Sequence, residues 1–239
     1  GELRTPGTLQ TRSMGGVGVG MRNAAAVNLL NPAAYSAVRP KSFLFDFGLE
    51  GQCFYNSQKY YGQTLNTSYY TVNFHDIAFQ LPIAKHLGLG FSLTPYSSVG
   101  YRMKQEVDDD EIWGNIGRVQ YQWDGDGDVT EVKLGLGWEI FRGFSIGIAA
   151  QYYWGDIQPI YKPAILENIT GGGLIADATG TETYSVSRFK GQFGVQWSPI
   201  SNRRRILTIG ATYDIGGDLN PNVTTKVQTG DIFNTVAMD

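Results

Sequence analysis

The chain has 239 residues, of which 42% are hydrophobic and only 17% are charged, and its formal net charge is −3. A single cysteine excludes an internal disulfide and any cluster of cysteine ligands, and the lack of a basic stripe argues against nucleic acid as a partner. No apolar run approaches the ~20 residues that a membrane-spanning helix needs. A transmembrane β-barrel fits this composition, because each of its strands is apolar on one face and polar on the other.

Residues 1–41 show no strand alternation and are rich in Gly, Ala and Asn, with prolines at positions 32 and 40. The chain opens in polar sequence without a signal peptide, so we expect that a secretion signal was removed before this start.

From residue 42 onward, apolar and polar residues alternate with a period of two, which is typical of strands with one apolar face. In the first stretch, one face carries apolar residues and the other carries mostly polar ones. The apolar face has Phe43, Phe45, Phe47 and Leu49, and the opposite face has Ser42, Asp46, Gly48, Glu50 and Gln52. Strands are predicted at residues 42–54, 68–84, 86–104, 129–141, 143–157, 184–198 and 204–216. In the second stretch the parity changes at His75 and Asp76, which predicts a β-bulge.

The predicted connections alternate between short turns and long polar loops, as in outer-membrane barrels with tight periplasmic turns and long outer loops. The polar faces carry Glu50, Lys133, Glu139 and Lys190, which would be costly in a dry core and cost little in a hydrated lumen. The apolar faces include Trp138, which would contribute to an interfacial aromatic girdle. We therefore predict an all-β, antiparallel transmembrane β-barrel over residues 42–239. The alternative is a soluble antiparallel sandwich with one wet face.

About seven strands are predicted, whereas single-chain bacterial barrels have even numbers. The chain ends at Asp239 in what we interpret as a polar loop without a closing strand. An open sheet would leave unpaired edges in lipid, so we expect comparable sequence to follow.

Residues 13–38 read SMGGVGVGMRNAAAVNLLNPAAYSAV, and SFLFDFG follows at 42–48. This sequence resembles the start of the FadL-type superfamily of outer-membrane transporters for hydrophobic compounds, and it is most similar to the branch found in Bacteroidota. In that branch a glycine-rich stretch precedes an NPA-Y motif and a first strand. The matching residues are Met14, Gly15, Gly16, Gly18, Gly20, Asn31, Pro32, Ala33 and Tyr35. The resemblance covers essentially the whole chain, which corresponds to the N-terminal half of a family barrel.

The resemblance implies a barrel of about 14 strands whose N-terminal segment, residues 1–41, folds inward as a hatch or plug. Its NPA-Y residues, Asn31, Pro32, Ala33 and Tyr35, would then be the plug and ligand-binding residues. Members of the superfamily pass long-chain fatty acids or other hydrophobic molecules, with a proposed lateral exit beside a kinked third strand.

The sequence bears on this exit independently, because Pro95 falls within the third predicted strand. Proline lacks the N–H that a ladder bond needs and marks a bulge or a break. Pro95, Tyr96 and Ser97 are therefore candidates for a lateral opening. An ordinary bulge at the barrel rim is the alternative.

Asp124, Asp126 and Asp128 have the spacing that begins a calcium-binding loop. Val129 stands where such a loop needs glycine, so the metal candidate is weak, and a solvated hairpin tip is the alternative. Acidic residues 108–111 fall in the same predicted loop and could bridge divalent cations to lipopolysaccharide phosphates.

The chain has only two histidines, His75 and His86. A Ser-His-Asp site around His75 and Asp76 is conceivable, but no G-x-S-x-G nucleophile motif, P-loop or dinucleotide fingerprint is present. We expect neither an enzyme nor a cofactor.

The leading hypothesis is passive uptake of a hydrophobic or amphipathic small molecule through a plugged barrel in the bacterial outer membrane. The alternative is an accessory barrel subunit of a larger outer-membrane complex. Expected partners are membrane lipid and lipopolysaccharide, a hydrophobic small molecule, and other outer-membrane proteins. Uptake predicts an apolar pocket beside the N-terminal segment, whereas an accessory role predicts a lumen filled by the protein's own side chains.

Overall fold

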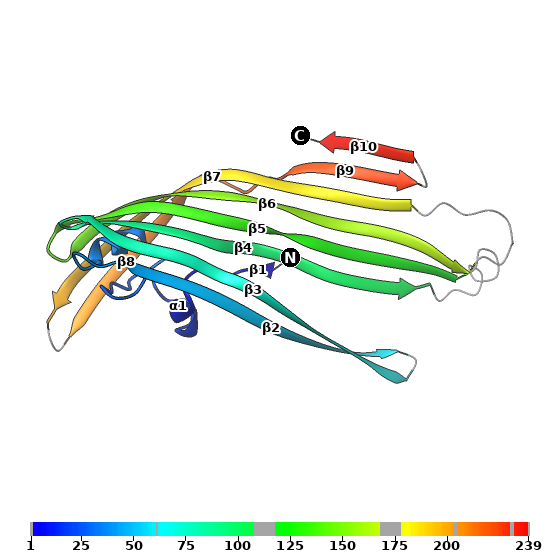
Figure 1. Ribbon diagram of the computed structural model, residues 1–239, viewed down its shortest axis with the longest axis horizontal. Coiled ribbons are helices and arrows are strands. Elements are labelled where there is room, and N and C mark those ends of the chain that lie inside the picture. The colour runs from blue at the N-terminus through cyan, green and yellow to red at the C-terminus, as the bar shows by residue number, and fades with distance from the viewer. Residues whose placement is uncertain are drawn as a thin grey trace.

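A computed structural model of the chain describes residues 2–60, 62–107, 118–167, 178–202, 205–229 and 232–238. All its strands belong to one antiparallel sheet that curls into a half-barrel, as Figure 1 shows. The long strands are β2 (Leu44–Tyr60), β3 (Gln63–Ala84), β4 (Leu87–Glu106), β5 (Arg118–Phe141), β6 (Phe144–Glu167) and β7 (Ala178–Ser201). The all-β prediction is confirmed, and the described residues contain no second sheet of the kind that a sandwich requires.

The seventh strand position is divided between two shorter strands, β8 (Ile206–Ile215) and β9 (Asn222–Thr229). Both pair with β7, β8 along residues 191–201 and β9 along residues 178–185. Strand β10 (Ile232–Met238) then pairs with β9. The prediction of a polar loop after residue 216 is therefore wrong. The Thr- and Val-rich sequence of β9 favours strand structure although it lacks an apolar face.

The strands are longer than predicted, because backbone pairing continues through polar residues in β2 and β3 and through the alternating Val119, Tyr121 and Trp123 of β5. Strands β2 and β3 pair as far as Tyr60 and Gln63, where a long loop had been predicted. Strand β5 has 24 residues and includes Asp124, Asp126 and Asp128, which were assigned to a hairpin tip. A strand of that length spans roughly 80 Å, whereas about 9–11 residues suffice to cross a bilayer.

The apolar faces of the strands point outward, and the charged faces point toward the concave side, as predicted. Among the apolar residues of these outward faces, Leu134 is 52% exposed and Ile148 is 53% exposed. Phe45, Phe193 and Ile209 are similarly exposed, and Leu89 is half-buried. The described residues contain no helix long and apolar enough to cross a membrane.

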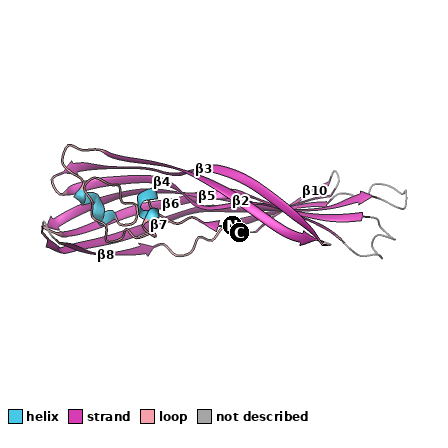
Figure 2. Ribbon diagram, turned by 90° about the horizontal axis from the view of Figure 1, so that it is seen from below, coloured by secondary structure: helices cyan, strands magenta, loops and turns pink. Residues whose placement is uncertain are grey.

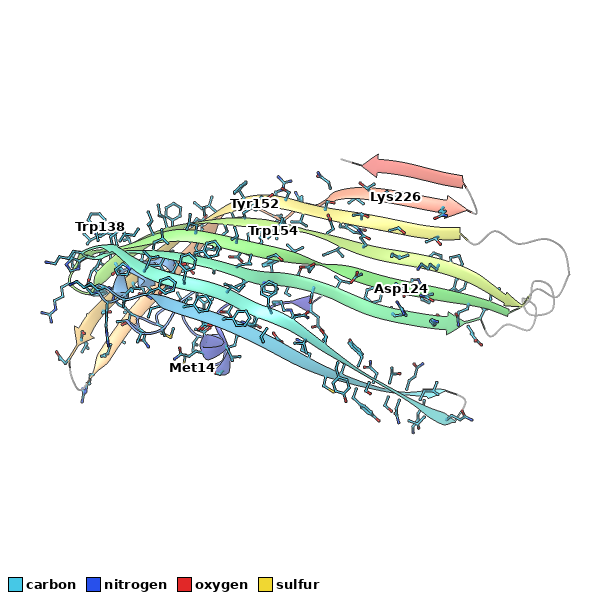
Figure 3. The ribbon with its side chains drawn as sticks, viewed as in Figure 1. Met14, Asp124, Trp138, Tyr152, Trp154 and Lys226 are labelled. Carbon is cyan, nitrogen blue, oxygen red and sulfur yellow. The ribbon has the colours of Figure 1, made fainter. Side chains whose placement is uncertain are left out.

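The outward apolar residues are concentrated in the half of the sheet near the short turns. Figure 3 shows Trp138 near these turns, Tyr152 and Trp154 closer to the middle, and Asp124 in the far half. Trp154 pairs with Thr130, which lies eight residues from Trp138 along β5. Eight residues span roughly 26 Å along a strand, close to the ~25 Å apolar band of outer-membrane barrels.

A line of irregularities crosses the sheet where this apolar half ends. Strand β3 has its bulge at His75, as predicted, since Gly48 pairs with Asp76 and the next residue of β2 pairs with Phe74. Strand β4 has a register shift between Pro95 and Ser97. At the same level Gly127 of β5 has a φ of 130° and Gly155 of β6 has a φ of 151°. These are backbone angles that side chains rarely permit. The strands therefore bend together along one line.

The N-terminal segment lies against the concave face of the apolar half. It contains β1 (Glu2–Leu3), α1 (Leu9–Ser13) and the 3-10 helix η1 (Pro32–Ala37). Figure 2 shows both helices close against the strands in this half. The core of the molecule forms here, with Ala33, Tyr35 and Ala78 almost fully buried.

Candidate functional site

The candidate site is the part of the concave face against which the N-terminal segment packs, and we call this surface the segment's seat. Helix η1 begins there because Asn31 caps it, its Oδ1 accepting a 3.0 Å hydrogen bond from Ala33 N, and because Pro32 needs no N–H partner in the first turn. The Asn31 amide also donates to the carbonyl oxygens of Val19 at 2.8 Å and Val195 at 3.1 Å. One buried side chain therefore joins the cap, the glycine-rich stretch and strand β7.

Helix η1 approaches the sheet closely because the strands present glycines beneath it. A Cβ on Gly90 would lie 2.6 Å from the Tyr35 ring, and one on Gly135 would lie 2.9 Å from the same ring. A Cβ on the other glycines in this patch would overlap Asn31, Pro32, Ala33 or Tyr35. We call the six residues the glycine floor: Gly88, Gly90, Gly135, Gly137, Gly147 and Gly194. The floor spans four neighbouring strands and leaves space for η1 alone.

Inward-facing polar side chains of the strands donate to carbonyl groups of the irregular segment. Gln80 Nε2 donates to Asn28 O at 2.9 Å, and Lys133 Nζ donates to Leu29 O at 2.9 Å. Gln196 Nε2 donates to Val19 O at 2.9 Å and to Met21 O at 3.1 Å. A segment without regular structure needs such partners for its backbone when it is buried. These three side chains, from β3, β5 and β7, are here called the carbonyl clamps.

Ion pairs join the same segment to the edges of the sheet. Arg4 and Arg12 both contact Glu50 Oε2 of β2, at 3.0 and 2.8 Å. Near the short turns Arg22 lies 3.7 Å from Glu139 of β5. Burial lowers the pKa of the Arg22 guanidinium, and Glu139 opposes this effect. Burial also raises the pKa of the Tyr35 hydroxyl well above its usual range, and the charge of Glu131 adds to the effect. The segment is therefore fixed at several separate points.

The structure brings together the four NPA-Y residues that the sequence indicated, Asn31, Pro32, Ala33 and Tyr35, all buried in or beside η1. Whether they bind a ligand or act as a plug stays a prediction. The sequence analysis missed the glycine floor and the carbonyl clamps. Their signal was present, because glycines and glutamines recur at inward positions of the predicted strands.

A cavity of about 350 Å³ remains between the N-terminal segment and the sheet. Its lining includes charged residues from three strands: Glu131 and Lys133 of β5, Lys190 of β7 and Asp214 of β8. The Lys133 amine is buried and lies 3.0 Å from Gln192 Oε1 and 3.8 Å from Glu131. The cavity therefore combines apolar lining with buried charged groups, unlike the predominantly apolar pocket that uptake of a hydrophobic molecule predicts.

The predicted lateral opening at Pro95, Tyr96 and Ser97 lies where two strands separate. Pairing between β3 and β4 ends at Ile77 and Leu93, just before Pro95. Strand β4 nevertheless stays paired with β5 on its other side, across the bulge. The break is thus confined to one edge of β4, and β1 pairs with that edge at Ser97 and Ser98.

The BamG family model matches residues 1–238, which is nearly the whole chain. The chain belongs to the BamG family. None of the curated proteins and none of the solved structures matches it. BamG membership and the barrel-like fold are both compatible with outer-membrane association.

Of the other sequence candidates in this BamG-family chain, the three aspartates lie apart from the cavity beside the N-terminal segment, whereas His75 lines it. Asp124 is 3.2 Å from Arg102 Nε and accepts a 2.7 Å hydrogen bond from Gln122. The described residues contain no group of three or more side chains suited to hold a metal ion, and the acidic residues 108–111 lie outside the described ranges. His75 contacts Asp76 in the bulge, where both side chains are buried.

Proposed function

We propose that this chain is an accessory subunit associated with the β-barrel assembly machinery of the bacterial outer membrane. The family name supports this role, since BamG designates a protein associated with that machinery. In this proposal the apolar band contacts membrane lipid, and the long polar half of the sheet contacts other outer-membrane proteins. The proposal assigns no catalytic step and no cofactor to the chain.

The observation that carries the proposal is the way the concave face is filled. The N-terminal segment sits on the glycine floor, and the carbonyl clamps of β3, β5 and β7 hold its backbone. The cavity of about 350 Å³ that remains beside this segment has charged side chains in its lining. A hydrophobic solute would have to displace buried hydrogen bonds and enter a cavity that contains Lys133 and Glu131, which is unfavourable. A filled face of this kind suits a structural subunit better than a conduit.

The experiment is affinity purification of the tagged full chain from outer membranes in mild detergent. We expect the central subunit of the barrel assembly machinery to co-purify in a constant ratio. We also expect depletion of the chain to lower the amount of folded barrel proteins in the membrane. Purification of the chain alone, together with unchanged barrel assembly after depletion, would contradict the proposal.

A second candidate, FadL-like uptake of a hydrophobic small molecule, is favoured by the separation of β3 from β4 beside Pro95. In this case the N-terminal segment acts as the hatch and the separation provides a lateral path. Replacing Ser97 by Trp should then slow fatty-acid uptake into cells without reducing the amount of folded protein. Unchanged uptake in that variant would remove this candidate.

A further inference from the structure

The separation of β3 from β4 leaves two strand edges facing a groove. Strand β2 stays paired with β3 as far as Gln63, and β5 stays paired with β4 as far as Glu106. Pairing between β3 and β4 stops at Leu93. Among the described residues, no strand therefore pairs with residues 63–74 of β3 on the side away from β2. The same is true of residues 99–105 of β4 on the side away from β5. We call these two edges and the space between them the strand notch.

The short strand β1 shows that the β4 edge accepts an added strand. Leu3 pairs with Ser97 and Glu2 pairs with Ser98, in antiparallel orientation. The backbone N–H of the following arginine, Arg4, donates to Tyr96 O at 2.8 Å. The Arg4 side chain also reaches Glu50 of β2 at 3.0 Å. Strand β1 thus occupies only the closed end of the notch, and the edge continues without a strand partner beyond Ser98.

Exposure of these edges is high. Residues 63–70 of β3 and residues 100–105 of β4 are all exposed to solvent. Each edge presents a row of backbone N–H and C=O groups, which is a template for pairing with another extended chain. Natural sheets usually cover or shorten such edges, so two long facing edges indicate a site that a partner completes.

The side chains around the notch define the chemistry of an occupant. They enclose a groove of about 770 Å³. Phe54 and Tyr69 stack there with ring centroids 4.7 Å apart. Three carboxylates line the groove: Glu2, Asp126 and Asp128. Among the described residues that line the groove, Arg4 is the only cation, and Glu50 already pairs with it. The groove is therefore apolar and aromatic on one side, with an excess of negative charge.

We propose that the strand notch binds an extended, basic segment of a partner outer-membrane protein, which adds as a strand to the β4 edge beyond β1. Backbone hydrogen bonds along residues 99–105 supply the affinity, and alternate side chains of the segment enter the groove and give the specificity. Lys or Arg side chains of the segment meet the carboxylates of Asp126 and Asp128. This inference rests on the proposed accessory function and names the surface through which that function would operate.

The test is site-specific photo-crosslinking in cells that express the tagged full chain. The photoreactive residue p-benzoylphenylalanine replaces Val99, Tyr101 or Met103 in turn, and Tyr213 on the outer face of β8 is the matched control, at 69% exposure. Neighbouring sites two residues apart on β4 should crosslink to sites about two residues apart on one contiguous partner segment, because paired strands keep register. The control should give no adduct on that segment.

The second measurement tests the role of the carboxylates of Asp126 and Asp128. Asp126→Asn combined with Asp128→Asn should lower the crosslinking yield at Tyr101 about threefold or more, since exposed ion pairs contribute roughly 0.2–1 kcal/mol each. Asp156→Asn is the control, because Asp156 is an exposed carboxylate on the next strand that does not line the groove. It should leave the yield unchanged.

Each outcome bears on a different claim. If the machinery co-purifies but the crosslinks scatter over unrelated partner segments, or fail to appear in the notch, this inference is wrong and the accessory function stands. Crosslinks that map to a second copy of this chain, or to residues of its own polypeptide, also overturn it. If no barrel-assembly subunit co-purifies at all, the proposed function itself fails.

Discussion

At the scale of single residues, the inner surface of the sheet fits the N-terminal segment because glycines there carry no side chain. The glycine floor leaves out side chains where η1 lies, and a Cβ at Gly147 would overlap the backbone of Pro32 and Ala33. Buried backbone cannot move aside without losing its hydrogen bonds. Positions that look like weak strand formers are therefore where the N-terminal segment is recognised.

Replacing Gly147 by Ala should destabilise the seated segment by about 1–3 kcal/mol, the usual cost of overpacking a close contact. Protease digestion should then cleave within residues 1–41 faster than in the unmodified protein, while the strands stay intact. Gly191→Ala is the control, because a Cβ on Gly191 meets nothing within 4 Å. Equal cleavage rates for the two variants would show that the close approach is not needed.

Asn31 allows its two hydrogen-bonding roles to be separated. An aspartate at this position keeps the oxygen that caps η1 but loses the N–H donors to Val19 and Val195. We expect Asn31→Asp to cost about 1–3 kcal/mol, measured by urea unfolding, because an acceptor oxygen replaces the donor beside Val195 O, while Val19 O keeps its hydrogen bond from Gln196. Asn23→Asp serves as control, because exposed Asn23 only accepts a hydrogen bond, from Ala25 N. A neutral Asn31→Asp would mean that water replaces the lost donors.

At the scale of elements, the sequence predicted strands where long apolar faces occur and missed most of their extensions beyond those faces. The alternation located β2 to β8, their short turns and the bulge at His75. It missed the far halves of β2, β3 and β5, and it missed β9. In the far halves of β2 and β3 few apolar residues mark a face, and pairing there is carried by backbone hydrogen bonds and strand propensity. In β5 a period was present at Val119, Tyr121 and Trp123, and the prediction overlooked it. The seating of η1 could not be predicted either, because it depends on residues from four strands.

The apolar band gives a prediction for the outer surface of β5. Leu134→Arg should destabilise the protein in lipid bilayers by about 2–4 kcal/mol if the residue lies near the midplane. Leu65→Arg is a matched control, since Leu65 of β3 is also 52% exposed but lies in the far, polar half of the sheet. We expect the control to unfold like the unmodified protein. Equal effects at both positions would exclude a membrane boundary between them.

At the scale of the whole molecule, a line of bulges and bends separates the apolar half of the sheet from its polar half. The bulges at His75 and Pro95 and the bends at Gly127 and Gly155 lie side by side where the dense band of outward apolar residues gives way to a more polar surface. Short turns lie on one side of this line, and long polar hairpins lie on the other, as Figure 1 shows. In a barrel with periplasmic turns, the polar half would extend about 40 Å outside the cell.

The single cysteine tests this orientation without any substitution. Cys53 is exposed on β2, beyond the bulge level marked by Gly48, and its partner in the register is Tyr70 of β3. A membrane-impermeant maleimide should therefore label Cys53 in intact cells. In a Cys53→Ser background, a cysteine replacing Ile148 should resist the same reagent, because a residue in the apolar band is shielded by lipid. Labelling of Cys53 only after the outer membrane is permeabilised would place the long hairpins in the periplasm. The strand notch would then face partners on the inner side of the membrane.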